Sequence, residues 1–187
     1  SAAWDVDVTR VAGRIDQLAR VEPTLRQAYL RSISEATAEL PFAEAEKIVL
    51  DQGAPLLWTY LHTADGMAVG VPGTWMYDDS PGGPGYDHRR EGWYKAAVAD
   101  PQQRGVLWTA TADESGLGLT INAVQTIRDR SHRIVAVAGV DIWLQRFIDD
   151  WLEIPALAGA EAILLDPQGR VMVRSSQKAN ACLLYTS

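Results

Sequence analysis

The chain has 187 residues, of which 47% are hydrophobic and 22% are charged, as is usual for a folded domain. Its net charge of −7 and isoelectric point near 4.9 argue against nucleic acid or an anionic membrane surface as a partner. The single cysteine, Cys182, excludes an internal disulfide and a cysteine-based zinc site, and no apolar run reaches the ~18 residues that would span a bilayer.

The first 53 residues are predicted to be mainly helical. Over residues 4–38, apolar side chains recur at three- and four-residue spacing, and Pro23 stands where a helix can restart in its first turn. Pro41 interrupts the pattern, and a shorter helix is expected to end near Gly53. We interpret residues 1–53 as a helical stalk, which could also pair two copies of the chain as a homodimer.

After Gly53, the pattern changes to that of strands. Residues rich in strand formers, bounded by turn signals, predict strands over residues 55–62, 67–71, 106–112, 117–127 and 131–142, the last of them central to the sheet. A helix is expected from about residue 143 to 152, and a further hairpin covers residues 162–173. This order predicts an α+β fold with antiparallel strands.

A segment rich in glycine and proline, residues 70–87, fits no regular element. A structureless stretch of this length inside a compact domain is usually a lid or binding loop. The alternative is a disordered insertion, against which Trp75, Met76 and Tyr77 argue, because disordered segments contain few such residues. The acidic residues of this loop lack the alternate spacing and closing glutamate of a calcium loop, so no metal site is expected.

Motifs of common enzymes are missing from the chain. It contains no GxSxG, GxxxxGK, HExxH or GxGxxG pattern. The three histidines, His62, His88 and His132, are scattered without the spacing of metal ligands. We therefore expect neither catalysis nor a bound cofactor.

Asp141 and the pair Trp93–Tyr94 are the candidate functional residues. Asp141 ends a run that is typical of a buried strand, where a carboxylate needs a cation or several hydrogen-bond donors. It could instead cap the helix expected near Trp143. Trp93 and Tyr94 stand together at the start of a helix, where they could line a pocket and attract an ammonium group. The alternative is that they form a packing wedge.

Three segments together resemble a double Cache sensor domain, the extracytoplasmic part of bacterial chemoreceptors and histidine kinases. They are YDHRREGWYKAA at residues 86–97, LWT at residues 107–109 and GVDI at residues 139–142. The resemblance covers roughly residues 4–175. It implies a long N-terminal helix, a membrane-distal PAS-like module that binds a ligand, and a membrane-proximal PAS-like module. It also implies a periplasmic location and a full-length protein anchored in the inner membrane.

On this basis, the chain is divided into four parts. Residues 1–53 form the stalk, residues 54–155 the distal ligand-binding module, and residues 156–176 the start of a truncated proximal module. The sequence from 177 to 187 shows no periodicity that joins it to the rest, and we expect it to be a non-native tail.

The resemblance also implies a ligand site. Family members that bind amino acids hold the ligand carboxylate with an arginine two residues before the tryptophan, where this chain has Glu91. The aromatic pair and the ammonium-binding aspartate correspond to Trp93, Tyr94 and Asp141. The candidate ligand-binding residues are therefore Trp93, Tyr94, Asp141, Glu91, Tyr86, Asp87, Trp108 and Arg89.

The exchange of arginine for Glu91 reverses a charge and favours a small cation without a carboxylate, such as an amine. Two alternatives stay open. Arg89 or Arg90 could take over the carboxylate of an amino acid, or the domain could be a ligand-free ectodomain that is structural or binds a partner.

Overall fold

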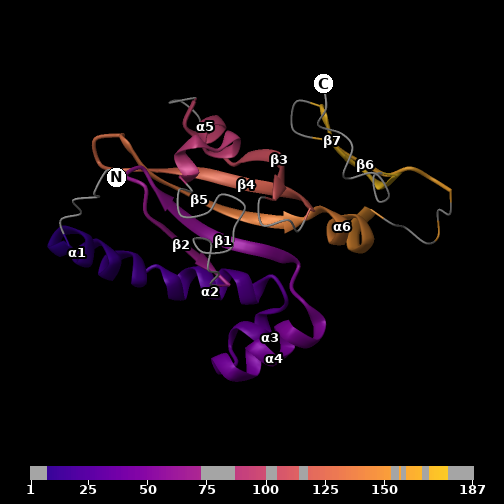
Figure 1. Ribbon diagram of the computed structural model, residues 1–187. Coiled ribbons are helices and arrows are strands. Elements are labelled where there is room, and N and C mark those ends of the chain that lie inside the picture. The colour runs from indigo at the N-terminus through magenta and orange to yellow at the C-terminus, as the bar shows by residue number, and fades with distance from the viewer. Residues whose placement is uncertain are drawn as a thin grey trace, which may run out of the picture.

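The structure, a computed structural model, describes residues 8–72, 87–99, 105–113, 118–152, 156, 159–165 and 169–176. Most of the predicted loop at residues 70–87, and the whole predicted tail at residues 177–187, lie outside these ranges. The predicted fold class is confirmed: helices precede an antiparallel five-stranded sheet, which has the layout of a PAS-like module (Figure 1).

The helical entry comprises α1 (Val8–Ala19), α2 (Glu22–Arg31), α3 (Glu35–Ala38) and α4 (Phe42–Gln52). The continuous pattern predicted for residues 4–38 is thus divided, and Pro23 lies in the first turn of α2 as expected. Ser34 starts α3, because its Oγ accepts a hydrogen bond from the Thr37 amide at 3.0 Å. Helices α1 and α2 run in sequence along the sheet (Figure 1).

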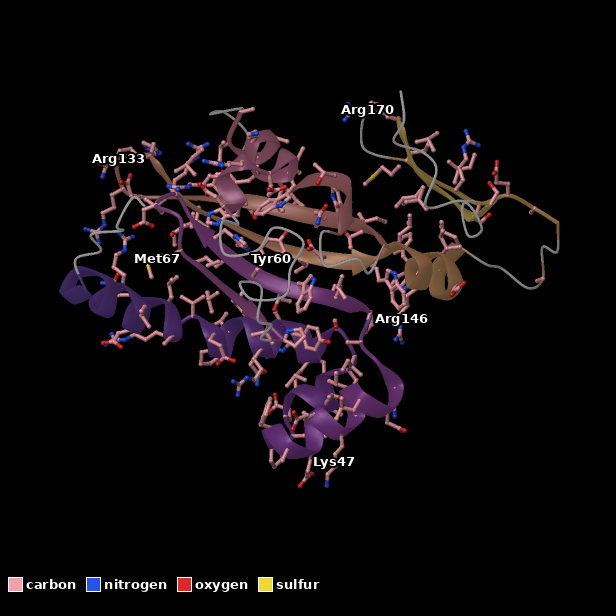
Figure 2. The ribbon with its side chains drawn as sticks, in the orientation of Figure 1. Lys47, Tyr60, Met67, Arg133, Arg146 and Arg170 are labelled. Carbon is pink, nitrogen blue, oxygen red and sulfur yellow. The ribbon has the colours of Figure 1, made fainter. Side chains whose placement is uncertain are left out.

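Helix α4 ends at Gly53, whose φ of +70° lies in the left-handed region that favours glycine. The guanidinium of Arg146 packs against Gly53, and its Nη1 donates a hydrogen bond to the carbonyl of Gln52 at 3.3 Å. Figure 2 shows Arg146 beside the segment that joins α4 to the sheet. A cation at the C-terminus of a helix is favourable because of the helix dipole.

The sheet has the strand order β2-β1-β5-β4-β3, and all its neighbouring strands are antiparallel. Its strands are β1 (Leu56–Thr63), β2 (Ala68–Val71), β3 (Leu107–Asp113), β4 (Gly118–Arg128) and β5 (Ile134–Trp143). Strand β5 is central, as its apolar sequence predicted. Each predicted strand lies within three residues of an observed one.

Helices cover both faces of this sheet. On one face, Thr59 of β1 donates through Oγ1 to the carbonyl of Leu25 in α2, at 3.0 Å. On the other face, Tyr60 joins a core with Val124 and Val137 beneath α5 (Gly92–Ala99). Because successive side chains of a strand point to opposite sides, these contacts place α2 and α5 on opposite faces (Figure 1).

Beyond β5 the chain forms α6 (Leu144–Phe147), a π-helical segment η3 (Ile148–Leu152) and a separate hairpin of β6 (Ile163–Leu165) and β7 (Val171–Arg174). Val173 of β7 is buried in one cluster with Ile121, Leu144 and Ile148. The boundary at residue 155 stays a prediction. Within the described ranges, no helix is both long and apolar enough to cross a bilayer.

Candidate functional site

Asp141 lies inside β5, with a strand on either side. It is opposite Trp58 of β1 and opposite Asn122 of β4. Its Oδ1 accepts a hydrogen bond from Asn122 Nδ2 at 2.6 Å and another from Tyr60 Oη at 2.8 Å. Helix α6 begins only at Leu144, so Asp141 is not at the helix cap position. The carboxylate is held by side chains of the neighbouring strands.

Tyr60 reaches Asp141 by lying across Gly139. The two residues are opposite each other on β1 and β5, and a Cβ at Gly139 would lie 2.6 Å from the Cε2 and Cζ atoms of the tyrosine ring. Only the missing side chain of Gly139 allows the ring this path. Figure 2 shows Tyr60 near the middle of the molecule, on β1.

An aromatic cluster covers the same face of the sheet. We use this name for Tyr60, His62, His88, Trp93 and Tyr94. The ring centroid of Trp93 is 5.4 Å from that of Tyr60, 5.2 Å from that of His62 and 5.6 Å from that of Tyr94. Trp93 therefore adjoins Asp141 through Tyr60, whose hydroxyl binds the carboxylate.

The two aromatic residues at the start of α5 differ in their burial. Tyr94 is buried in the core with Ala97, Val124 and Val137, and burial raises the pKa of its hydroxyl. Trp93 is only partly buried at the edge of this core. The packing role expected as an alternative therefore describes Tyr94 well, whereas Trp93 keeps part of its surface available to a ligand.

Two histidines that are 26 residues apart in the sequence meet in this cluster. The ring centroids of His62 and His88 are 4.4 Å apart and the rings are nearly perpendicular. His88 Nε2 lies 3.0 Å from the carbonyl oxygen of Thr63, which can only accept, so this nitrogen carries the proton. Burial, and then the neighbouring His88, lowers the pKa of His62 to about 3. Burial also lowers the pKa of His88.

The other charged candidates lie near the opposite end of β1. Arg89 donates to both carboxylate oxygens of Asp87, from Nε at 2.8 Å and from Nη2 at 2.9 Å. The hydrogen bond from Arg89 lowers the pKa of Asp87 to about 2. The same guanidinium packs against Gly66, in the turn after β1. Glu91 is half-buried between the 3₁₀ turn η2 (His88–Arg90) and α5.

Trp108 is not brought to this face. Its neighbour Thr109 is opposite Asn122, which is opposite Asp141, so Thr109 shares the face of Asp141 and Trp108 points to the other side. The side chain of Trp108 is 40% exposed there. Tyr86 lies outside the residues that the structure describes.

Sequence reasoning missed four residues of this site: Tyr60, His62, Asn122 and Gly139. Residues 58, 60 and 62 are Trp, Tyr and His, and the two-residue period of a strand puts them on one face. That signal was present in the sequence. The partners across the sheet were not, because they depend on the register between strands far apart in the chain.

The arrangement can bind a small organic cation. The carboxylate of Asp141, which accepts hydrogen bonds from Tyr60 and Asn122, offers a counter-charge, and the adjoining faces of Tyr60 and Trp93 suit an ammonium group. Among the described residues, no three histidine, cysteine or carboxylate side chains gather as metal ligands would.

No family model and no curated protein matches the chain. Similar solved structures are ligand-binding domains of chemoreceptors. That of CtaA from Pseudomonas fluorescens, in complex with L-isoleucine, is 21% identical with a TM-score of 0.49, covering 89% of this chain and 64% of that one. That of the amino-acid chemoreceptor PctB from Pseudomonas aeruginosa PAO1, in complex with L-Gln, is 19% identical with a TM-score of 0.48, covering 84% and 66%.

The domain of the P. aeruginosa amino-acid chemoreceptor PctC, in complex with GABA, is 18% identical with a TM-score of 0.48, covering 90% of this chain and 76% of that one. The chain thus spans about 64% of the length of the CtaA domain. These solved structures are Cache-type sensor domains, the class of protein that the sequence resembles.

Proposed function

We propose that this chain is the extracytoplasmic sensor part of a transmembrane signalling receptor, and that it binds a small amine on the face of the sheet beneath α5. The observation that carries the proposal is the carboxylate of Asp141. It is set into the central strand, held by Tyr60 and Asn122, and joined through Tyr60 to the half-buried ring of Trp93. We propose that a ligand ammonium group binds to this carboxylate and packs against the adjoining rings.

The charges along this face favour a cation. Both histidines of the aromatic cluster are neutral at pH 7, because burial lowers their pKa values. Asp87 and Arg89 form an ion pair with each other and so contribute no net charge. Glu91, next to the aromatic pair in the sequence, stands where amino-acid-binding relatives of the resembled family have an arginine, so the expected carboxylate-binding cation is absent from that position.

An amino acid is the less favoured ligand, because its carboxylate would need a cation. Arg89 and Arg90 are the candidates, and Arg89 is bound to Asp87 by two hydrogen bonds and packed against Gly66. Gly66 follows β1, whereas Asp141 is opposite Trp58 near its start, which separates the two levels of the strand by roughly 20 Å. An amine is therefore the favoured class of ligand, and an amino acid is the less favoured one.

As a mechanism, we propose a shift between two conformations of the domain. The ligand favours the one in which the segment around residues 70–87 closes over the site, and the N-terminal helices carry the change toward the membrane. Residues 54–155 act as the distal module and residues 156–176 as the start of a proximal one. Residues 1–53 supply the stalk, with homodimerisation through it as part of the proposal.

Thermal unfolding of the chain with a panel of amines, amino acids, carboxylates and calcium tests this function. A ligand at one hundred times its Kd adds ~2.7 kcal/mol, which corresponds to a rise in Tm of roughly 5–10 °C for a protein of this size. We expect such a rise with one or more amines. It should vanish in Asp141→Asn, which keeps the shape of the side chain but removes the charge.

The matched control is Asp51→Asn, which removes one carboxylate from the exposed surface of α4. This variant should keep the full response to amines. Responses to amino acids in place of amines would overturn the choice of ligand class. If no compound of the panel raises the Tm, the alternative is favoured in which the aromatic cluster only packs α5 onto the sheet.

A further inference from the structure

His62 of β1 carries a buried polar atom whose partner is missing from the part of the chain that the structure describes. The residue is 4% exposed, and its Nδ1 is buried without a hydrogen-bond partner in the described ranges. Leaving such an atom unpaired costs ~1–3 kcal/mol. A phenylalanine would fill the same place without that cost. Packing therefore gives no reason for a polar atom at Nδ1, whereas a hydrogen-bonding group on a ligand would supply one.

Three aromatic neighbours hold the ring of His62 in place. Its centroid lies 4.9 Å from that of Tyr60, 5.2 Å from that of Trp93 and 4.4 Å from that of His88, and each pair is nearly perpendicular. Edge-to-face contacts of this kind are favourable. The ring of His62 is therefore packed against three rings of the aromatic cluster, of which Tyr60 also contacts Asp141.

His62 and Asp141 lie on the same face of the sheet, with Tyr60 between them. His62 is opposite Val137 of β5, four residues before Asp141, which separates the two backbone levels by roughly 13 Å. Tyr60 spans this gap, because its ring contacts His62 and its hydroxyl donates to Asp141 at 2.8 Å. Trp93 contacts the rings of both Tyr60 and His62. The rings of Tyr60 and Trp93 thus form an aromatic wall between the carboxylate of Asp141 and the imidazole of His62.

The chemistry of His62 limits what it can bind. A neutral imidazole has one N–H donor and one acceptor nitrogen, so it can make one further hydrogen bond of either kind. Because its pKa is held to about 3 by burial, it carries no positive charge with which to balance a carboxylate. A charged group brought beside it would lose its hydration without compensation. A neutral hydroxyl or amide fits.

We infer that His62 is a second ligand-binding residue, and that the ligand is a monoamine with an aromatic middle and a neutral hydrogen-bonding group at its far end. The inference depends on the proposed function, since Asp141 is taken to hold the ammonium group. Tyr60 and Trp93 contact the aromatic middle of the ligand, and His62 hydrogen-bonds its far end. His62 thereby selects hydroxyl-bearing amines over their unsubstituted analogues.

Isothermal titration of the chain with tyramine and with phenethylamine tests this role, because the two amines differ only by the phenolic hydroxyl. One hydrogen bond to an otherwise unpaired buried atom corresponds to about a tenfold difference in Kd. We expect tyramine to bind that much more tightly. His62→Phe should bind both amines with equal affinity, and His62→Gln, which retains a donor and an acceptor, should recover part of the difference.

The matched control is His132→Asn. His132 is an exposed histidine in the β4–β5 hairpin with a φ of +62°, a conformation that asparagine tolerates. This variant should keep the tenfold preference. In addition, the ¹⁵N resonance of His62 Nδ1 should change with tyramine and not with phenethylamine. That spectroscopic readout needs no substitution, so it decides the matter even if a variant at position 62 fails to fold.

Equal affinity of the unmodified chain for the two amines overturns the role of His62. So does a preference for tyramine that survives in His62→Phe. In either case Asp141-dependent binding of amines would leave the proposed function standing. If neither amine binds while another amine does, the inference about the far end of the ligand fails alone; if no amine binds at all, both proposals fail.

Discussion

The ring of Tyr60 lies directly over Gly139, on the neighbouring strand. A Cβ on this glycine would be 2.6 Å from two ring carbons and 2.7 Å from the hydroxyl oxygen, closer than atoms can approach without displacement. This overlap is what allows Tyr60 Oη to reach Asp141, at 2.8 Å. A glycine in β5 thus has a positional role: it opens the path by which a tyrosine orients the candidate ligand-binding carboxylate.

Gly139→Ala should therefore disturb both stability and binding. The added methyl group forces the Tyr60 ring off its position, and overpacking of a core typically costs about 1–3 kcal/mol. We expect a fall of this size in the free energy of unfolding, measured with urea, and weaker amine binding. Gly105→Ala is the control, because no atom lies within 4 Å of its added Cβ. Equal stability of the two variants would contradict the steric argument.

Tyr60→Phe should weaken the hold on Asp141 while leaving the aromatic wall in place. A hydrogen bond to a charged group is worth about 1.5–3 kcal/mol, so we expect a loss of unfolding free energy in that range. In a double-mutant cycle with Asp141→Asn, the two changes should be non-additive by ~1 kcal/mol, because each residue acts through the other. The buried Tyr29 of α2, on the other face of the sheet, provides the control as Tyr29→Phe. Additivity of Tyr60→Phe with Asp141→Asn would show that their contact contributes little.

The buried histidines should make the fold sensitive to mild acid. Folding lowers the pKa of His62 from about 6.5 to about 3, so between these values only the unfolded chain takes up the proton. The stabilising contribution of His62 to the free energy of unfolding should therefore be present in full well above pH 6.5, and it should decline as the pH falls toward 3. At pH 5 the contribution of His62 is smaller by about 2 kcal/mol than at pH 7.

Urea denaturation at pH 7 and pH 5 measures this effect. His62→Phe should lose the part of the difference that comes from His62 and keep the part that comes from the buried His88, while His132→Asn should retain the whole difference. The carboxylates with lowered pKa values, on Asp87, Asp129 and Glu161, start to titrate only at lower pH and so act outside most of this window. A pH dependence that is identical in His62→Phe and the unmodified chain would refute the assignment to His62.

Arg89→Ala tests whether the ligand is an amine or an amino acid. The ion pair of Arg89 with Asp87 is solvent-exposed, so its loss should change the free energy of unfolding by less than about 1 kcal/mol. We expect the amine affinity to be unchanged, since Arg89 lies near the turn after β1 and Asp141 near the other end of that strand. Arg130→Ala, at an exposed arginine of the β4–β5 turn, is the matched control. Loss of ligand binding in Arg89→Ala alone would point to a carboxylate on the ligand.

Much of the fold could be predicted from local patterns. The three- and four-residue spacing of apolar side chains located the helices before Gly53, and runs rich in strand formers, bounded by turn signals, located all five strands of the sheet. Pro23 marked the start of α2, and the apolar run before Asp141 identified β5 as the central strand. Such signals are local, because a helix or strand exposes its period to any window of about ten residues.

The site could be predicted only in part, for a physical reason that Trp108 makes plain. Its strand was predicted, but whether Trp108 or Thr109 faces Asp141 depends on the register of β3 with β4 and of β4 with β5. A shift of one residue would reverse the answer. Register is set by packing between segments that are far apart in the chain, and local periodicity does not contain it.

Local patterns in the sequence were enough to place the helices and strands approximately, Asp141 within the central strand, and an aromatic pair at the start of α5. Three contacts became visible in the folded chain alone: the Tyr60 ring crosses Gly139 to reach Asp141, Arg89 pairs with Asp87, and His62 packs against His88. The contacts of Tyr60 and of His62 join residues that are far apart in the sequence, so local patterns cannot reveal them. The ion pair of Arg89 with Asp87 is local, but a flexible arginine side chain could equally have turned toward other partners. The packing of the strands and helices against one another decides which of these contacts form.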